Sequence, residues 1–353
     1  MPITRLTANN FTVFNRLDIS FSYGINVFIG DNGTGKTHLL KALYAFCECD
    51  KTPFSLDKRP NMGIEDNVIS SSEFTISFFH NSFFEMLQRY FLVDSIKALY
   101  NGYQNEPSFS ITYVSNKEPF QFESTIYKQN MEHSELCDIN AAFIPAKEML
   151  THSRIEKDYA VRKVPFDETL IDIINKTGST ELRKLDERSR NIMNSIENII
   201  RGKVFIDKDI YYISRGNVKY SFQVEAEGYK KFAALLRLVE TGALANGSIL
   251  FWDEPEVNIN PQNIPALVDI LVTLQEMDVQ IFIATHDYIL AKYLEVRINR
   301  NNGLLFHALY KDPYNDNGAI LSESDKSFTA LKNNDIVKQS IALYEEEVEK
   351  VLG

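Results

Sequence analysis

One stretch of the sequence decides the fold: Gly30-Asp31-Asn32-Gly33-Thr34-Gly35-Lys36-Thr37. It matches the pattern G-x-x-x-x-G-K-[ST], in which the glycines let the backbone wrap closely enough for several N–H groups to converge on phosphate oxygens. Lys36 is expected to reach the β- and γ-phosphates of a nucleotide, and the Thr37 hydroxyl to ligate Mg²⁺. The stretch therefore predicts a site for ATP and Mg²⁺ in which all eight residues contact the nucleotide or its metal.

The residues around this loop meet the structural requirement of the motif. Ile25–Ile29 is a short apolar run, typical of a buried parallel strand, and residues 36–46 carry the apolar stripe of a helix. The N-terminus of that helix adds its positive dipole end to the phosphate site. Upstream, Ile3–Asn10 and Val13–Phe21 are predicted to form a pair of strands. A strand followed by the loop and then a helix makes a chance match a weak explanation.

A second apolar run ends in carboxylates. Ser248-Ile249-Leu250-Phe251-Trp252-Asp253-Glu254-Pro255-Glu256 predicts a buried strand whose carboxyl end faces the phosphate loop. Asp253 is expected to hold Mg²⁺, and Glu254 to accept a proton from the water that attacks the γ-phosphate. Glu256 is expected to be structural and to contact the turn at Asn258–Pro261.

A histidine follows the next apolar strand. Gln280–Ala284 is predicted to pair in parallel with the acidic strand through a helix at Ile264–Leu274, and Thr285-His286-Asp287 comes directly after it. A histidine at a strand end is by itself an ordinary turn residue. Its order in the chain, after the loop and the acidic pair, favours a hydrogen bond from His286 to the γ-phosphate.

Composition gives no support to nucleic-acid binding and favours a cytoplasmic protein. The 353 residues carry a formal net charge of −11, whereas a protein whose whole surface serves nucleic acid is normally basic. No run of eighteen apolar residues and no N-terminal leader pattern occurs, so we expect a cytoplasmic protein with no membrane segment. Cys47, Cys49 and Cys137 are too few for a disulfide framework and lack the spacing of a zinc site.

The quoted stretches resemble the ABC ATPase superfamily, and specifically its SMC/RecF/OLD-like branch. The resemblance rests on Asn10-Phe11 through Gly24–Gly30, the loop to Thr37, the acidic segment Asp253–Glu256, and Thr285–Asp287. It implies an α/β fold with a mixed sheet, in which a second protomer completes the nucleotide site across a dimer or larger homo-oligomer. In these terms residues 1–48 and 203–353 form the ATPase head, 49–140 a mixed α and β insertion, and 141–202 a core strand followed by a helical lid or arm.

Two features of the family are altered in this sequence. The candidate for the L-S-G-G-Q signature is Glu225–Lys231, where Ala226 replaces the serine, Glu227 replaces the first glycine and only Gly228 remains. Either Lys230 or Lys231 then supplies positive charge to the nucleotide of the second protomer, or the segment is a plain helix N-terminus with solvated lysines.

The glutamine loop is altered as well. The strand Ala142–Pro145 resembles the one before that loop, but Ala146-Lys147-Glu148 follows. Lys147, Glu148 or a residue of the insertion is expected to take the place of the glutamine near Mg²⁺. A transporter subunit normally has both the full signature and the glutamine, so that function ranks last.

Compact members of this branch without a coiled coil resemble the stand-alone ATPases of bacterial anti-phage systems: Septu, the retron-associated ATPases and PARIS. The segment after His286 shows no acidic cluster that would bind catalytic metals, so any effector is expected to be a separate chain. The predicted function is a switch or scaffold driven by ATP. The alternative is a DNA-binding repair ATPase similar to RecF, which a salt-dependent DNA titration would distinguish.

The sequence also gives expectations for the aromatic residues of the insertion and for the C-terminal helix. A set of aromatic residues is interpreted as a core of the insertion: Phe78, Phe79, Phe83, Phe84, Tyr90 and Phe91. The C-terminal helix predicted at Asp335–Val351 is amphipathic and is expected to pack on its own domain.

Overall fold

The computed structural model describes residues 2–49, 83–102, 106–115, 118–125, 129–131, 139–155, 166–298, 303–314 and 318–352. Phe78, Phe79 and Cys137 lie outside these ranges, whereas the aromatic residues of 83–91 lie in a helix and Phe83, Phe84 and Tyr90 are buried as expected. Among the described helices, none combines the length and apolar content needed to cross a bilayer.

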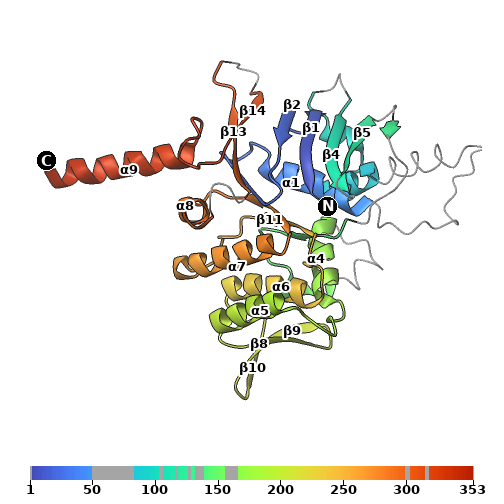
Figure 1. Cartoon of the computed structure of the whole chain (residues 1–353), viewed down its shortest axis with the longest axis vertical. Helices are drawn as coiled ribbons and strands as arrows, with labels where there is room; N and C mark the ends of the chain where they lie inside the picture. The colour runs from blue at the N-terminus through green and yellow to red at the C-terminus, as the bar shows by residue number, and fades with distance from the viewer. Residues whose placement is uncertain are drawn as a thin grey trace, which may run out of the picture.

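The central element is a six-stranded mixed sheet (Figure 1). Its order is β14-β13-β3-β12-β11-β7, and every neighbouring pair is parallel except β13 with β14. The strands are β3 (Ile25–Ile29), β7 (Ala141–Ile144), β11 (Ile249–Asp253), β12 (Gln280–Ala284), β13 (Leu304–Lys311) and β14 (Ile320–Asp325). Strands β3, β7, β11 and β12 are buried along their whole length, which explains their continuous apolar sequence.

The register of this sheet assembles the candidate site. Asp253 at the end of β11 lies opposite Ala284 at the end of β12, and Ala284 lies opposite Phe28 of β3. Because parallel strands end at the same edge, the segments that follow these three strands meet there. They are the phosphate loop, the acidic pair and the turn that contains His286.

A second sheet is antiparallel and has the order β2-β1-β4-β5-β6. Its strands are β1 (Ile3–Phe11), β2 (Phe14–Ser20), β4 (Ser108–Ser115), β5 (Glu118–Thr125) and β6 (Gln129–Met131). The strands of the predicted insertion thus extend the N-terminal strand pair. Helix α1 (Lys36–Glu48) packs its Leu39 and Leu43 in one core with residues of both sheets.

The other face of the central sheet is covered by helices and a small sheet. Helices α4 (Glu168–Gly178), α5 (Glu187–Ile200), α6 (Glu227–Glu240), α7 (Ile264–Glu276) and α8 (Tyr288–Arg297) contribute to a second core around Trp252. The antiparallel strands β8 (Lys203–Asp207), β9 (Ile210–Arg215) and β10 (Val218–Ser221) lie beside α5 and α6 (Figure 1). Short 3₁₀ turns occur at Ile96–Leu99, Leu150–His152 and Pro261–Asn263.

Charged contacts fix α1, the helix that begins at the phosphate loop, to α4. The Lys41 ammonium pairs with Asp167 at the N-terminus of α4, and Lys176 pairs with Glu48 at 2.8 Å. All four side chains are less than one-fifth exposed, so these pairs are only weakly screened by solvent. They hold the middle and the C-terminal end of α1 against the same neighbouring helix.

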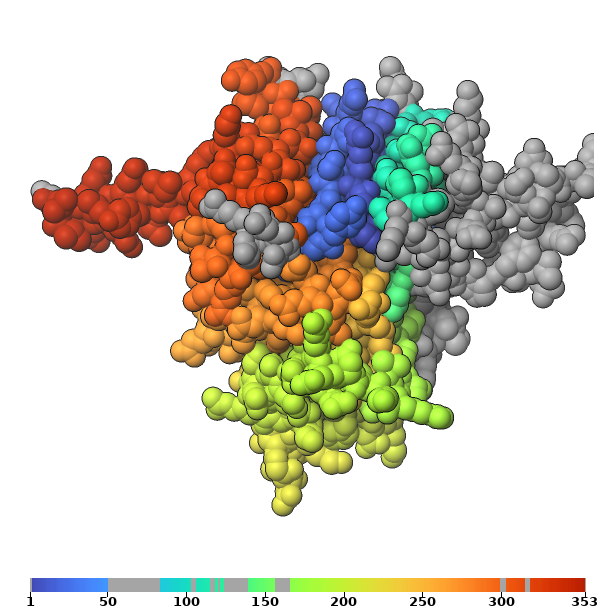
Figure 2. Space-filling view, viewed as in Figure 1, coloured from blue at the N-terminus to red at the C-terminus, as the bar shows by residue number. Residues whose placement is uncertain are grey.

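The C-terminal helix differs from expectation. Helix α9 (Asp335–Leu352) projects from the body, and none of its residues is buried (Figures 1 and 2). Only Ile336 and Val337, in its first turn, pack against the core. The expectation that this helix packs along its own domain is therefore wrong, although its bounds are as predicted.

Candidate nucleotide-binding site

The phosphate loop is shaped by close contact with the turn between β1 and β2. Gly35 has a φ of +89°, and a β-carbon there would lie 2.5 Å from the Phe14 ring and 2.6 Å from Val13. No other residue type fits both the left-handed backbone and this space. The Gly35 carbonyl accepts the first helical hydrogen bond, 2.9 Å from the Leu39 nitrogen, so the loop passes directly into α1.

Lys36 lies inside the loop. Its ammonium donates to the carbonyl oxygens of Gly30 at 2.7 Å and Asp31 at 2.9 Å, and the residue is 6% exposed. Burial lowers the pKa of Lys36 to about 8, against the opposing effect of the nearby Asp253 and Glu254 carboxylates. A phosphate group beside this ammonium would stabilise its charged form and replace the backbone acceptors.

Two side chains predicted to ligate Mg²⁺ are in contact. The Thr37 hydroxyl donates to Asp253 Oδ2 at 2.9 Å across 216 positions of sequence. Burial raises the pKa of Asp253, and the Thr37 hydrogen bond counteracts that rise. A hydroxyl and a carboxylate are hard oxygen donors of the kind that Mg²⁺ prefers, and Mg²⁺ commonly uses few protein ligands together with phosphate oxygens. The residues present therefore fit this ion.

The backbone of Glu254 is held in an uncommon conformation. Its φ is +48°, in the left-handed region that non-glycine residues seldom adopt. Two hydrogen bonds hold the turn: the Glu254 nitrogen donates to the Ala284 carbonyl at 2.8 Å, and the Lys231 ammonium donates to the Glu254 carbonyl at 2.7 Å. The carboxylate is 34% exposed at the edge of the sheet, where it is available to a water molecule.

Lys231 is part of this turn within its own chain. It is 3% exposed, and burial lowers its pKa to about 8 although Glu256 and Glu254 lie close enough to oppose the shift. The alternative of a solvated lysine at this position is therefore wrong. Contact between Lys231 and the nucleotide of a second copy stays a prediction.

His286 lies beside the acidic pair. Its Nε2 is 3.5 Å from Glu254 Oε1, and burial together with the Lys36 charge lowers its pKa. The imidazole is consequently neutral at pH 7 and keeps one N–H to donate. Lys36, Glu254 and His286 thus lie around one small region at the sheet edge.

The Glu256 side chain holds the turn that contains His286. Its Oε1 accepts from the Thr285 hydroxyl at 2.7 Å and from the His286 nitrogen at 3.2 Å. The predicted contact with the Asn258–Pro261 turn is made by the backbone alone, where the Ile259 nitrogen donates to the Glu256 carbonyl at 2.9 Å. The carboxylate therefore joins the ends of β11 and β12, and burial raises its pKa.

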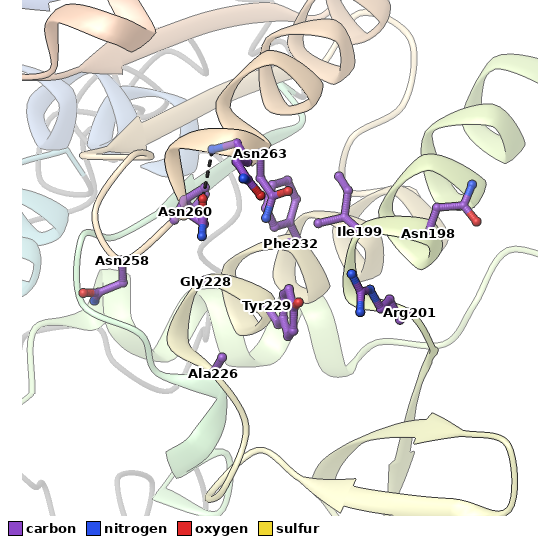
Figure 3. A pocket seen from close by; sticks show the side chains of 12 residues that line it. Asn198, Ile199, Arg201, Ala226, Gly228, Tyr229, Phe232, Asn258, Asn260 and Asn263 are labelled. Atoms are coloured by element: carbon purple, nitrogen blue, oxygen red, sulfur yellow. Dashed lines mark hydrogen bonds between the residues drawn. The ribbon is translucent and has the colours of Figure 1, made fainter.

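The altered signature segment begins α6 and borders a pocket of about 480 Å³ (Figure 3). The pocket is lined by the end of α5, the first turn of α6 and the loop Asn258–Asn263. A β-carbon on Gly228 would lie 2.5 Å from the Asn258 carbonyl oxygen, so glycine permits the close approach of that loop. Ala226, at the N-cap, offers no side-chain acceptor to the first amides of the helix.

The candidates for the missing glutamine lie after β7. Glu148 accepts from the Thr151 nitrogen at 3.1 Å and hydroxyl at 2.5 Å, and its carboxylate is 4.0 Å from the Lys230 ammonium. Lys147 is exposed. Within the described part of the chain, neither side chain has a hydrogen bond to Thr37 or Asp253, and the replacement of the glutamine stays a prediction.

Comparison with known proteins places this geometry in a family. Residues 91–291 match the family described as "AAA domain, putative AbiEii toxin, Type IV TA system", which is more than half of the chain. The chain belongs to that AAA-domain family. This family and the fold agree with the P-loop ABC-type ATPase of the SMC/RecF branch that the sequence predicts.

Solved structures share the fold of this chain. An Smc head bound to the C-winged helix domain of ScpA aligns over 94% of this chain and 100% of its own, with a TM-score of 0.57 and 13% identity. An Smc head from Pyrococcus furiosus bound to the C-terminal domain of ScpA aligns over 98% of both chains, with a TM-score of 0.51 and 11% identity. At such low identity the likeness concerns the fold alone.

The curated relatives match only a short part of the ATPase. The DNA replication and repair protein RecF of Clostridium kluyveri is 43% identical over 53 residues, which are 15% of this chain and 14% of RecF. RecF of Cytophaga hutchinsonii is 47% identical over 47 residues, 13% and 12% of the two chains. The chain thus spans about one-seventh of the length of the RecF proteins that it matches.

Sequence reasoning missed one supporting side chain of the site and assigned another to a different contact. Thr285 links the histidine turn to Glu256, and its position directly before His286 is the only signal in the sequence. Lys231 is singled out in the sequence, but its contact with the Glu254 carbonyl depends on how α6 packs under β11 and has no sequence signal.

The contact between Lys231 and Glu254 yields a prediction. Lys231→Met should lower kcat by about tenfold or more, because the left-handed turn that aims Glu254 loses a charged hydrogen bond. The Kd for ATP, measured by titration calorimetry, should change by less than about threefold. Lys184→Met, at an exposed lysine, is the matched control. An unchanged kcat for Lys231→Met would contradict this role.

Proposed function

We propose that this ATPase binds and hydrolyses Mg-ATP and acts as a nucleotide-dependent switch or scaffold for a separate effector protein. The hydrogen bond between Thr37 and Asp253 carries the proposal, because it brings the predicted metal-binding side chains to the edge that holds Lys36 and Glu254. A phosphate loop alone would support binding only. A carboxylate aimed at the same edge supports hydrolysis.

Each residue then has a task in the reaction. Lys36 and the loop amides hold the β- and γ-phosphates, while Mg²⁺, when bound by Thr37 and Asp253, supplies charge that offsets those phosphates. A water molecule attacks the γ-phosphorus, its proton passes to the Glu254 carboxylate, and the bond to the β–γ bridging oxygen breaks to give ADP and phosphate. The neutral His286 donates its N–H to a γ-phosphate oxygen, and loses that acceptor when phosphate leaves.

The site is proposed to be completed by a second copy of the chain. Within the described residues, no hydrogen bond joins Glu225–Lys230 to the loop Gly30–Thr37, so the segment does not complete the site of its own chain. The N-terminus of α6 carries partial positive charge and has no side-chain cap at Ala226. These properties, and the pocket beside Gly228, suit contact with the phosphates held by another protomer.

A role in bacterial anti-phage defence has separate support. The description of the matched family names a toxin and a type IV toxin–antitoxin system. No group of three metal-binding side chains occurs in the described ranges. ATP would then change what this chain holds, and hydrolysis would reset it.

A DNA-handling function similar to that of RecF is the second candidate, and one surface favours it. Lys203 and Lys219 both lie beside Ser214 in the register of β8, β9 and β10, so they share a face of this sheet. On the same face Phe205 and Tyr212 stack at 5.3 Å, and the Lys219 ammonium lies 4.8 Å from the Phe205 ring. Aromatic rings flanked by cations suit single-stranded nucleic acid.

Titration with a labelled single-stranded oligonucleotide tests this candidate. A DNA-handling ATPase should bind at or below about micromolar Kd in 50 mM salt, and Lys203→Ala/Lys219→Ala should lower the salt slope by about two because two phosphate contacts are lost. Lys311→Ala, an exposed lysine of β13, is the control. Absence of binding, or binding that the double variant leaves unchanged, would remove this candidate.

The proposed switch predicts the behaviour of Glu254→Gln. This variant should retain ATP binding, lose turnover by about a hundredfold or more because no carboxylate accepts the proton, and shift to a closed oligomer with Mg-ATP. Particle mass by light scattering, with and without Mg-ATP, checks the shift. Lys36→Ala is the control that should lose both binding and shift. Full turnover in Glu254→Gln would exclude Glu254 as the base.

A further inference from the structure

Helix α9 leaves the body after its first turn (Figure 2). Its apolar side chains are then open to solvent: Ile341 is 52% exposed, Tyr344 66% and Leu352 82%. In proteins most of the stability of a helix comes from tertiary packing of its apolar face, which α9 lacks beyond its first turn. We therefore expect the exposed apolar side of α9 to contact a partner.

The apolar residues follow the spacing of a coiled-coil seam. Val337, Ile341, Tyr344, Val348 and Val351 are separated by four, three, four and three positions, which places them on one stripe of the helix. Along one border of this seam lie Lys338 and Glu345, and along the other lie Ser340 and Glu347. The charges beside such a seam decide the partner and its direction.

We propose that α9 is an interface at which two copies of the chain pair antiparallel. In this register Ile341 packs against Tyr344 of the second copy, and Val348 packs against the part of Val337 that its own body leaves exposed, with each contact made twice. The contact is self-complementary, as two-fold symmetry requires. It is separate from the candidate nucleotide site, to which α9 contributes no residue.

The border charges favour the antiparallel direction. Antiparallel pairing places Glu345 beside Lys338 of the second copy, twice, and leaves Glu347 beside Ser340. Parallel pairing would place Glu345 beside Ser340 and Glu347 beside Leu352, so no opposite charges would meet. In the single chain Lys338 pairs with Asp335 at 2.9 Å, and both side chains are more than half exposed, so exchanging that partner costs little.

Sedimentation equilibrium of the full chain without nucleotide tests the interface. We expect a concentration-dependent dimer of twice the 40.5 kDa chain mass. Lys338→Glu and Glu345→Lys should each weaken the dimer by about tenfold, because each places like charges together at both symmetry-related contacts along that border, and the double variant should restore wild-type affinity. Ile341→Glu should abolish the dimer by placing a charge in the seam.

Two controls separate this interface from the nucleotide-dependent one. Glu346→Lys reverses an exposed charge on the side of α9 opposite the seam and should leave the dimer unchanged. Lys36→Ala should abolish ATP-dependent association and leave the α9 dimer intact. A monomer at all concentrations without nucleotide would overturn the proposal. So would a double charge exchange that fails to restore the affinity lost in the single variants.

Discussion

The hydrogen bond between Thr37 and Asp253 is the contact on which the functional part of the molecule depends. It joins the start of α1 to the end of β11, and it can form only if β3, β12 and β11 end level with one another. That alignment is held by three fully buried parallel strands, in which a slip by one residue would disrupt the close packing of side chains in the cores on both faces of the sheet. The hydrophobic core thus sets the position of polar atoms at its edge.

Strain at this edge is balanced by nearby contacts. Glu254 adopts a left-handed backbone, and Lys231 and Ala284 hold it there from two sides. Lys231 belongs to α6, the helix that begins with the altered signature segment and whose Gly228 contacts the loop at Asn258. A movement of α6 caused by a second copy would therefore reach the turn that holds Glu254, which would give a physical route from assembly to the proposed hydrolysis.

Much of this arrangement can be predicted from the sequence, and the elements that were not predicted have a physical explanation. Continuous apolar runs such as Ile25–Ile29 and Gln280–Ala284 predict buried strands with correct bounds. Helix α8 was not predicted, because the apolar residues of Tyr288–Arg297 spread around the helix and leave no periodic stripe. The periodicity of α9 predicts an apolar stripe but not what packs against it. That depends on tertiary contacts, either with the rest of the same chain or with another copy.

The central claim is that one copy supplies the phosphate loop and another supplies the N-terminus of α6. ATPase activity of mixed variants tests it most directly. Lys36→Ala disables the loop, and Ala226→Asp caps α6 and places a negative charge where the phosphates would lie. Each variant alone should be inactive, and an equimolar mixture should regain about a quarter of wild-type activity, since half of the dimers then contain one intact composite site. A mixture as inactive as its components would show that each chain works alone.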